Sequence, residues 1–120
     1  MPTPHPTDLR ERVFEFVCLA VLFCRELSKE SGTVRQIAWQ LANAASSAGA
    51  NLEEAKAAYS RRDFAAKNSI SLKEMREALY WLRVIAKCNL APPEVVQPLL
   101  AEANELTAML TAGMKRLHPV

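Results

Sequence analysis

Glu54, Glu74 and Glu77 are the residues of this sequence that most resemble metal ligands, because all three lie in stretches with helical periodicity. Helix bundles that hold two iron ions take Glu from two helices and a Glu-x-x-His pair from each of two others. The two histidines, His5 and His118, lie near the two ends of the chain and outside the predicted helices. We therefore predict no metal site, and we expect the carboxylates to cap Ser, Asn or Lys groups.

The three cysteines, Cys18, Cys24 and Cys88, are odd in number and form no Cys-x-x-Cys pair. Neither a disulfide framework nor a zinc site is encoded by that pattern, so we expect small buried apolar side chains. The sequence also lacks a glycine-rich phosphate loop and a nucleophile beside a base. It therefore predicts a protein that is not an enzyme and needs no cofactor.

Four amphipathic helices are predicted along the chain of 120 residues. Apolar residues recur at i, i+3, i+4 and i+7 in four segments, at about residues 8–31, 33–60, 62–88 and 93–117. Asp8, Thr33 and Ser60 each precede an acidic or amide residue by three positions, as helix-starting residues do. We predict one all-α domain over residues 8–117, an antiparallel up-and-down four-helix bundle, preceded by a disordered or extended tail at residues 1–7.

The ends of these helices carry their own signals. Gly32 is predicted to end the first helix and Asn89 the third, and Pro98 to lie in the first turn of the fourth or at its true start. The small residues of "SSAGAN", residues 46–51, resemble a loop, yet the apolar spacing of residues 33–60 continues through them to Tyr59. We therefore predict an unbroken helix there, with a slim side that lets another helix approach closely.

Three of the predicted helices also carry unusual side chains outside the face that points to the core. The second helix has a stripe of amides and hydroxyls, the third has Trp81 with Ile70 and Ile85, and the first is apolar nearly all round. Such faces favour a homo-oligomer, and packing against a different protein is the alternative. The candidate interface residues are Leu19, Leu22, Ser47, Asn51, Glu54, Ile70, Glu74 and Trp81.

Positive charge is concentrated in the middle of the chain. The net charge is +2, but residues 33–90 hold nine Lys and Arg against five Asp and Glu. A basic strip that includes an aromatic ring is typical of a surface that follows phosphates, although strips of this size are also found on ordinary solvated faces. The candidate nucleic-acid contacts are Arg61, Arg62, Lys73, Arg76, Tyr80, Arg83 and Lys87.

The sequence shows neither an N-terminal signal peptide nor an apolar run long enough to span a membrane. The N-terminal "MPTPHPTD" lacks the basic and apolar regions of a signal peptide, and the longest apolar run, Phe16–Cys24, has nine residues where a membrane span needs about 20. We therefore expect a cytoplasmic protein with no membrane partner.

The stretch "SSAGANLEEAKAAYSRRDFAAKNSISLKEMREALYWLRVIAK", residues 46–87, resembles the 23S rRNA intervening-sequence protein family. The matching elements include Gly49-Ala50-Asn51, Asp63-Phe64, Leu72-Lys73-Glu74 and Tyr80-Trp81-Leu82. The resemblance implies a bacterial four-helix bundle that assembles as a ring-like homopentamer without known catalytic activity. A related branch serves diversity-generating retroelements as an accessory protein that binds nucleic acid and the reverse transcriptase.

Residues and resemblance together predict a non-enzymatic oligomeric scaffold or accessory protein. We expect weak, salt-dependent binding of RNA or DNA through the hairpin of residues 33–60 and 62–88. The expected partners are further copies of the chain, RNA or DNA, and a reverse transcriptase or another protein encoded nearby. The alternative is a protein-interaction adaptor with no role in nucleic-acid binding.

Overall fold

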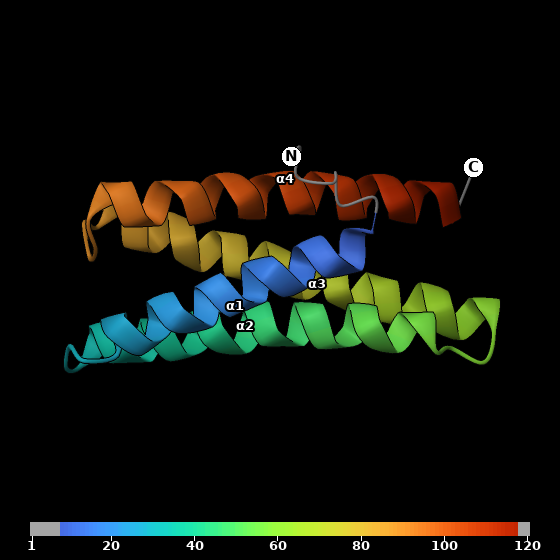
Figure 1. Cartoon of the computed structure of the whole chain (residues 1–120), viewed down its shortest axis with the longest axis horizontal. Coiled ribbons are helices and arrows are strands. Elements are labelled where there is room, and N and C mark those ends of the chain that lie inside the picture. Colours follow the sequence, from blue (N-terminus) through green and yellow to red (C-terminus); the bar gives the residue numbers. More distant parts are fainter. Residues whose placement is uncertain (1–7, 118–120) are drawn as a thin grey trace, which may run out of the picture.

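A computed structural model describes residues 8–117, and this part of the chain is folded into four α-helices without a β-strand. Figure 1 shows successive helices running in opposite directions, with α1 crossing obliquely between α2 and α4. The predicted all-α up-and-down bundle is confirmed, while the predicted tail at residues 1–7 lies outside the described residues. The helices are α1 (Leu9–Leu27), α2 (Thr33–Lys56), α3 (Arg61–Lys87) and α4 (Pro93–Leu117).

Two of the three predicted helix starts are built as expected. The Asp8 carboxylate accepts a hydrogen bond from the Arg10 backbone N–H, and the Ser60 hydroxyl accepts one from the Asp63 N–H. The prediction that Thr33 caps α2 is wrong, because Thr33 is already the first helical residue. Gly32 is the cap, with φ at +66° and no side chain to bond the helix.

The first two helices end earlier than their apolar spacing predicts. Helix α1 stops at Leu27, and residues 28–30 follow in tight turns, so Gly32 does not end that helix. Helix α2 stops at Lys56 because Ser60 must be extended to cap α3. Tyr59 consequently lies in the connecting loop and is fully exposed instead of continuing the core stripe.

The end of α3 and the start of α4 are set by special backbone residues. Asn89 has φ at +53° and ends α3 as predicted, with its N–H bonded to the Ala86 carbonyl oxygen. Helix α4 begins at Pro93, where the missing N–H costs nothing. The prediction for Pro98 is wrong, because this residue lies in the second turn of α4. Pro98 is exposed, so water can bond the backbone carbonyl oxygen that the missing Pro98 N–H leaves without a helical partner.

The core runs along the centre of the bundle and takes residues from all four helices. Most residues of the predicted apolar stripes are buried, Val13, Leu41 and Leu106 among them. Ile85 was predicted to lie on a second, outward face, but it is completely buried. Phe64 shares the apolar spacing of residues 62–88, yet it is more than one third exposed, because it lies in the first turn of α3 at the end of the bundle.

The "SSAGAN" stretch is helical, and it is where α2 meets its neighbours most closely. A β-carbon built on Gly49 would lie 2.9 Å from Cγ2 of Val17 on α1. On the side of α3, the buried Ser71 hydroxyl donates to the Ala48 carbonyl oxygen over 2.7 Å. The slim side predicted for this helix is therefore confirmed, and the helices that use it belong to the same chain.

Candidate nucleic-acid interface and assembly faces

The predicted basic strip lies on one side of α3, with Arg61 and Arg62 in the first turn and the other five members between Lys73 and Lys87. Helical geometry places its members within about a third of the helix circumference, along a length of roughly 39 Å. All seven side chains are exposed, and Tyr80 keeps 53% of its surface accessible. We call this surface the α3 basic face; its residues are Arg61, Arg62, Lys73, Arg76, Tyr80, Arg83 and Lys87.

The cations of the α3 basic face are not neutralised by carboxylates of the described chain. Among residues 8–117, none of these six side chains takes part in an ion pair. Lys67, on another side of α3, instead contacts Glu54 of α2 at 3.5 Å. Six cations on one helix face are therefore without a carboxylate partner within the described residues.

Two open grooves lie along the seam between α3 and α4, at opposite ends of the basic face. One has a volume of about 530 Å³ and is lined by Arg61 and Arg62 together with the end of α4. The other has a volume of about 700 Å³, and Tyr80, Arg83 and Lys87 line it. The sequence assigned this surface to the hairpin of α2 and α3, whereas both grooves border α4, which sequence spacing does not reveal.

The aromatic pair of α3 is held in a defined arrangement. The rings of Tyr80 and Trp81 meet edge to face, with centroids 5.1 Å apart and planes at 75°. The Trp81 Nε1–H donates to a carboxylate oxygen of Glu77 at 3.2 Å, and Trp81 is half-buried against the core. Trp81 is therefore not the wasteful exposure inferred from the sequence, and its part in an oligomer interface stays a prediction.

The polar residues predicted for an assembly face on α2 find partners within the chain. The Asn51 side-chain amide donates to the Ser47 carbonyl oxygen at 2.9 Å and also contacts its hydroxyl. Glu54 pairs with Lys67, which ties α2 to α3. Throughout residues 8–117, no buried side-chain nitrogen or oxygen lacks a hydrogen-bond partner, so an oligomer is not needed to satisfy them.

The apolar surface predicted on α1 is present and extends to both of its sides. Leu19 and Leu22 are 56% and 49% exposed, and Phe14 on the side towards α2 is also half exposed. Trp39 of α2 is 63% exposed and was missed from the sequence. Its helical-wheel position, nearly opposite the core stripe, would have identified it.

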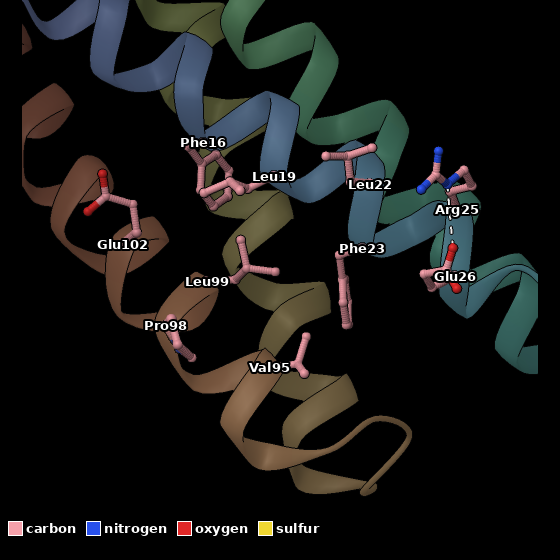
Figure 2. Close-up of a pocket in the computed structure, with 10 residues that line it drawn as sticks. All are labelled: Phe16, Leu19, Leu22, Phe23, Arg25, Glu26, Val95, Pro98, Leu99 and Glu102. Carbon is pink, nitrogen blue, oxygen red and sulfur yellow. Dashed lines mark ion pairs between the residues drawn. The ribbon is translucent and has the colours of Figure 1, made fainter.

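An apolar groove separates the second half of α1 from the first half of α4, which we call the α1–α4 groove. Its volume is about 390 Å³, and Figure 2 shows Phe23, Val95 and Leu99 projecting into the space between the two helices. The seam between these helices is the loosest of the four in the bundle. The groove is therefore an apolar recess that adjoins the exposed leucines of α1.

One ion-pair cluster closes the other half of the same seam. The Arg12 guanidinium contacts both carboxylate oxygens of Glu102 at 2.8 Å and one of Glu105 at 3.2 Å. These hydrogen bonds raise the pKa of Arg12 further above its usual value. The cluster joins the N-terminal half of α1 to α4, while the α1–α4 groove stays open along the second half of α1.

The carboxylates and cysteines that we considered as metal ligands contact other groups of the chain or lie at its surface. Glu54 accepts a hydrogen bond from Lys67, as expected, whereas Glu77 accepts one from Trp81 and not from a Ser, Asn or Lys group. No three His, Cys, Asp or Glu side chains gather in a metal-binding cluster within the described residues. Burial raises the pKa of the Cys24 thiol to about 11, but the expectation of buried cysteines fails at the exposed Cys88, which lines the larger basic groove.

Within residues 8–117, no helix combines the length and the apolar character needed to traverse a lipid bilayer.

Comparisons with known proteins agree with the architecture. A crystal structure of a protein of unknown function from the S23 ribosomal protein family of Bacteroides thetaiotaomicron VPI-5482 superposes with a TM-score of 0.80. The two sequences are 28% identical, and the match covers 89% of this chain and 98% of the other.

A search of curated proteins gives no match. The model of the 23S rRNA-intervening sequence protein family matches residues 7–112, which is most of the chain. This match agrees with the resemblance carried by residues 46–87. The chain therefore belongs to the 23S rRNA-intervening sequence protein family.

Proposed function

We propose that this protein is a cytoplasmic, non-enzymatic scaffold that binds RNA or DNA electrostatically through the α3 basic face. The observation that carries the proposal is the set of six exposed cations on one helix face, none of them ion-paired within the described residues. Phosphates neutralised by such a face release condensed counterions, which drives binding at low salt. The modest net charge of +2 keeps this binding weak, and the release of counterions makes it strongly salt-dependent.

A titration at two salt concentrations tests the proposal. Structured RNA and duplex DNA should bind at 50 mM salt, and six phosphate contacts should weaken the affinity about 10³-fold at 200 mM. The combined substitution of Lys73, Arg76 and Arg83 by Glu should abolish binding. Absence of binding to either nucleic acid at the lower salt concentration would overturn the proposal.

The matched control reverses the same number of charges elsewhere. Arg25 lies in the last turn of α1, Lys29 in the turn that follows it, and Lys56 at the end of α2. All three are exposed, and their replacement by Glu gives the same net charge. This variant should keep most of its affinity for nucleic acid. Equal losses in both triple variants would show that binding follows net charge and not the α3 basic face.

We further propose that copies of the chain assemble, as a homopentamer, through the exposed apolar side chains of α1. Support comes from Leu19 and Leu22, two exposed apolar side chains that lie outside the core stripe of α1. Sedimentation should give a mass near five times the 13.3 kDa of one chain. Replacing both leucines by Glu should dissociate the assembly, while the control variant with Glu11→Lys and Glu15→Lys should stay assembled. A wild-type chain that is monomeric at micromolar concentration would contradict the assembly proposal.

The α1–α4 groove favours a second candidate function, that of a protein-interaction adaptor. Its apolar lining at Phe23, Val95 and Leu99 suits the apolar face of a partner helix. By family resemblance, a reverse transcriptase encoded nearby is the partner we propose for this role. Co-purification of such a protein with the wild-type chain but not with Leu99→Glu would support the adaptor, and equal recovery with both would exclude the groove.

A further inference from the structure

We propose that the groove beside Tyr80 binds unpaired nucleotides, with one base stacked on the Tyr80 ring and the adjoining phosphates held by Arg83 and Lys87. This inference rests on the proposed nucleic-acid function and specifies its ligand as single-stranded RNA or DNA. The groove has a volume of about 700 Å³, within the range of small-ligand sites.

The first argument is the arrangement of residues along α3. Tyr80, Arg83 and Lys87 follow one another at spacings of three and four residues, so they are neighbours on one helix face. Surfaces that bind single strands combine these two elements, an aromatic platform for the base and cations for the backbone. Among the described residues that line the groove, none is Asp or Glu, so no carboxylate stands in direct contact with a phosphate bound there.

The second argument is that the Tyr80 ring is already positioned. Its edge-to-face contact with Trp81 occupies at most one ring face, and 53% of the residue stays accessible. Trp81 is in turn fixed by its hydrogen bond to Glu77 and by packing on the core. A platform that is ordered before binding loses little conformational entropy when a base stacks on it.

The third argument concerns duplexes. Inside a duplex both faces of each base are covered by neighbouring bases, so away from the duplex ends a stack on Tyr80 requires an unpaired nucleotide. From the α4 side, Gln97 supplies an amide that can both donate and accept hydrogen bonds with a base edge. The groove therefore distinguishes unpaired strands from duplexes, although the cations of the α3 basic face attract both.

Fluorescence anisotropy with matched oligonucleotides tests the stacking step. The probes are a thymidine 12-mer, a uridine 12-mer, an abasic 12-mer and a 12-base-pair DNA duplex, all at low salt. The thymidine or uridine strand should bind roughly 5- to 150-fold more tightly than the abasic strand, the range measured for one stacked base. The two base-bearing strands separate DNA from RNA as the source of the ligand.

Two variants separate stacking from structural damage. Tyr80→Ala should lower the affinity for the base-bearing strand to that for the abasic strand, and leave duplex binding unchanged. Tyr80→Phe should keep the wild-type preference, because it retains the ring and its contact with Trp81. Equal affinities of wild type for all probes, or equal losses of Tyr80→Ala on all of them, would overturn the groove proposal while the electrostatic function stands; no binding at all would overturn both.

Cys88 provides an independent readout of location because its exposed thiol lines the same groove. Saturating thymidine 12-mer should slow alkylation of Cys88, measured on peptides by mass spectrometry. Cys18, which lies on α1, is the reference within the same molecule and should react at an unchanged rate. An unchanged rate at Cys88 would place the bound strand elsewhere and overturn the proposal.

Discussion

Gly49→Ala is the substitution whose effect follows most directly from the packing of α1 on α2. The added methyl group would lie 2.9 Å from Cγ2 of Val17, closer than carbon atoms approach in proteins, so one helix must shift. Val17 cannot simply rotate away, because a β-branched side chain in a helix has one strongly preferred rotamer. The substitution therefore overpacks the α1–α2 seam.

The magnitude is a balance of two effects. Overpacking of a well-packed region costs about 1–3 kcal/mol. Replacing Gly by Ala inside a helix contributes about 1 kcal/mol in the opposite direction, because Ala loses less backbone entropy. We expect a net loss of about 0–2 kcal/mol in the free energy of unfolding, and a melting temperature lower by about 4 °C for each kcal/mol.

Two further variants separate the terms. In a Val17→Ala background the clashing methyl group is absent, and Val13 Cγ1 at 3.8 Å is an ordinary contact, so Gly49→Ala should there stabilise by about 1 kcal/mol. Gly113→Ala in α4 is the control for helix propensity alone, because its new methyl group would meet only the Arg116 guanidinium, at 3.9 Å. It should also stabilise by up to about 1 kcal/mol.

Urea unfolding of all four variants at one protein concentration measures these differences, since assembly makes apparent stability depend on concentration. The reasoning requires the sign of the Gly49→Ala effect to reverse between the two backgrounds. If Gly49→Ala stabilised the wild type as much as it stabilises Val17→Ala, the close approach of α1 and α2 would be refuted.

Three further predictions concern single contacts and one titration. Ser71→Ala should lower the free energy of unfolding by about 1 kcal/mol in urea titrations, because its buried hydroxyl bonds the Ala48 carbonyl oxygen; an unchanged midpoint would contradict this. Arg12→Met should cost up to about 1 kcal/mol at low salt and less at high salt, because its ion pair with Glu102 is partly exposed. Equal costs at both salt concentrations would rule out the ionic explanation. Burial raises the pKa of Cys24 to about 11 from 9.0, because the folded state disfavours the thiolate. The stability that the neutral thiol contributes is therefore fully present below pH 9 and is lost as the pH rises through 11. Cys24→Ala should therefore show a shallower alkaline loss of stability, and parallel profiles would argue against the titration.

The spacing of apolar residues was sufficient to predict the helices and most of the core. Val13, Leu41 and Met75 are buried because helical geometry places apolar residues three and four apart on one face of each helix. That face is defined by the helix itself and does not depend on which neighbouring helix covers it. Helix ends were predicted less well where a neighbouring element decides them. Tyr59 continues the apolar pattern of α2, but the extended backbone required at Ser60 ends that helix first.

Relations between helices could not be obtained from spacing alone. Ile85 lies at the edge of the stripe on α3, and burial there depends on where the neighbouring helices sit. The seven residues of the α3 basic face were all identified from sequence, because charge and period are local properties. That Tyr80 and Gln97 line one groove required the packing of α4 on α3.

The loose seam between α1 and α4 has a consequence for folding kinetics. The closely packed seams join helices that follow one another along the chain, whereas α1 and α4 stand at opposite ends of the sequence and meet least. Most native contacts therefore close short loops, the topology that lets helical bundles fold in microseconds to milliseconds. Because the Arg12 cluster spans about 90 residues, we expect it to form after the hairpin of α2 and α3, so that its removal accelerates unfolding and hardly alters the folding rate.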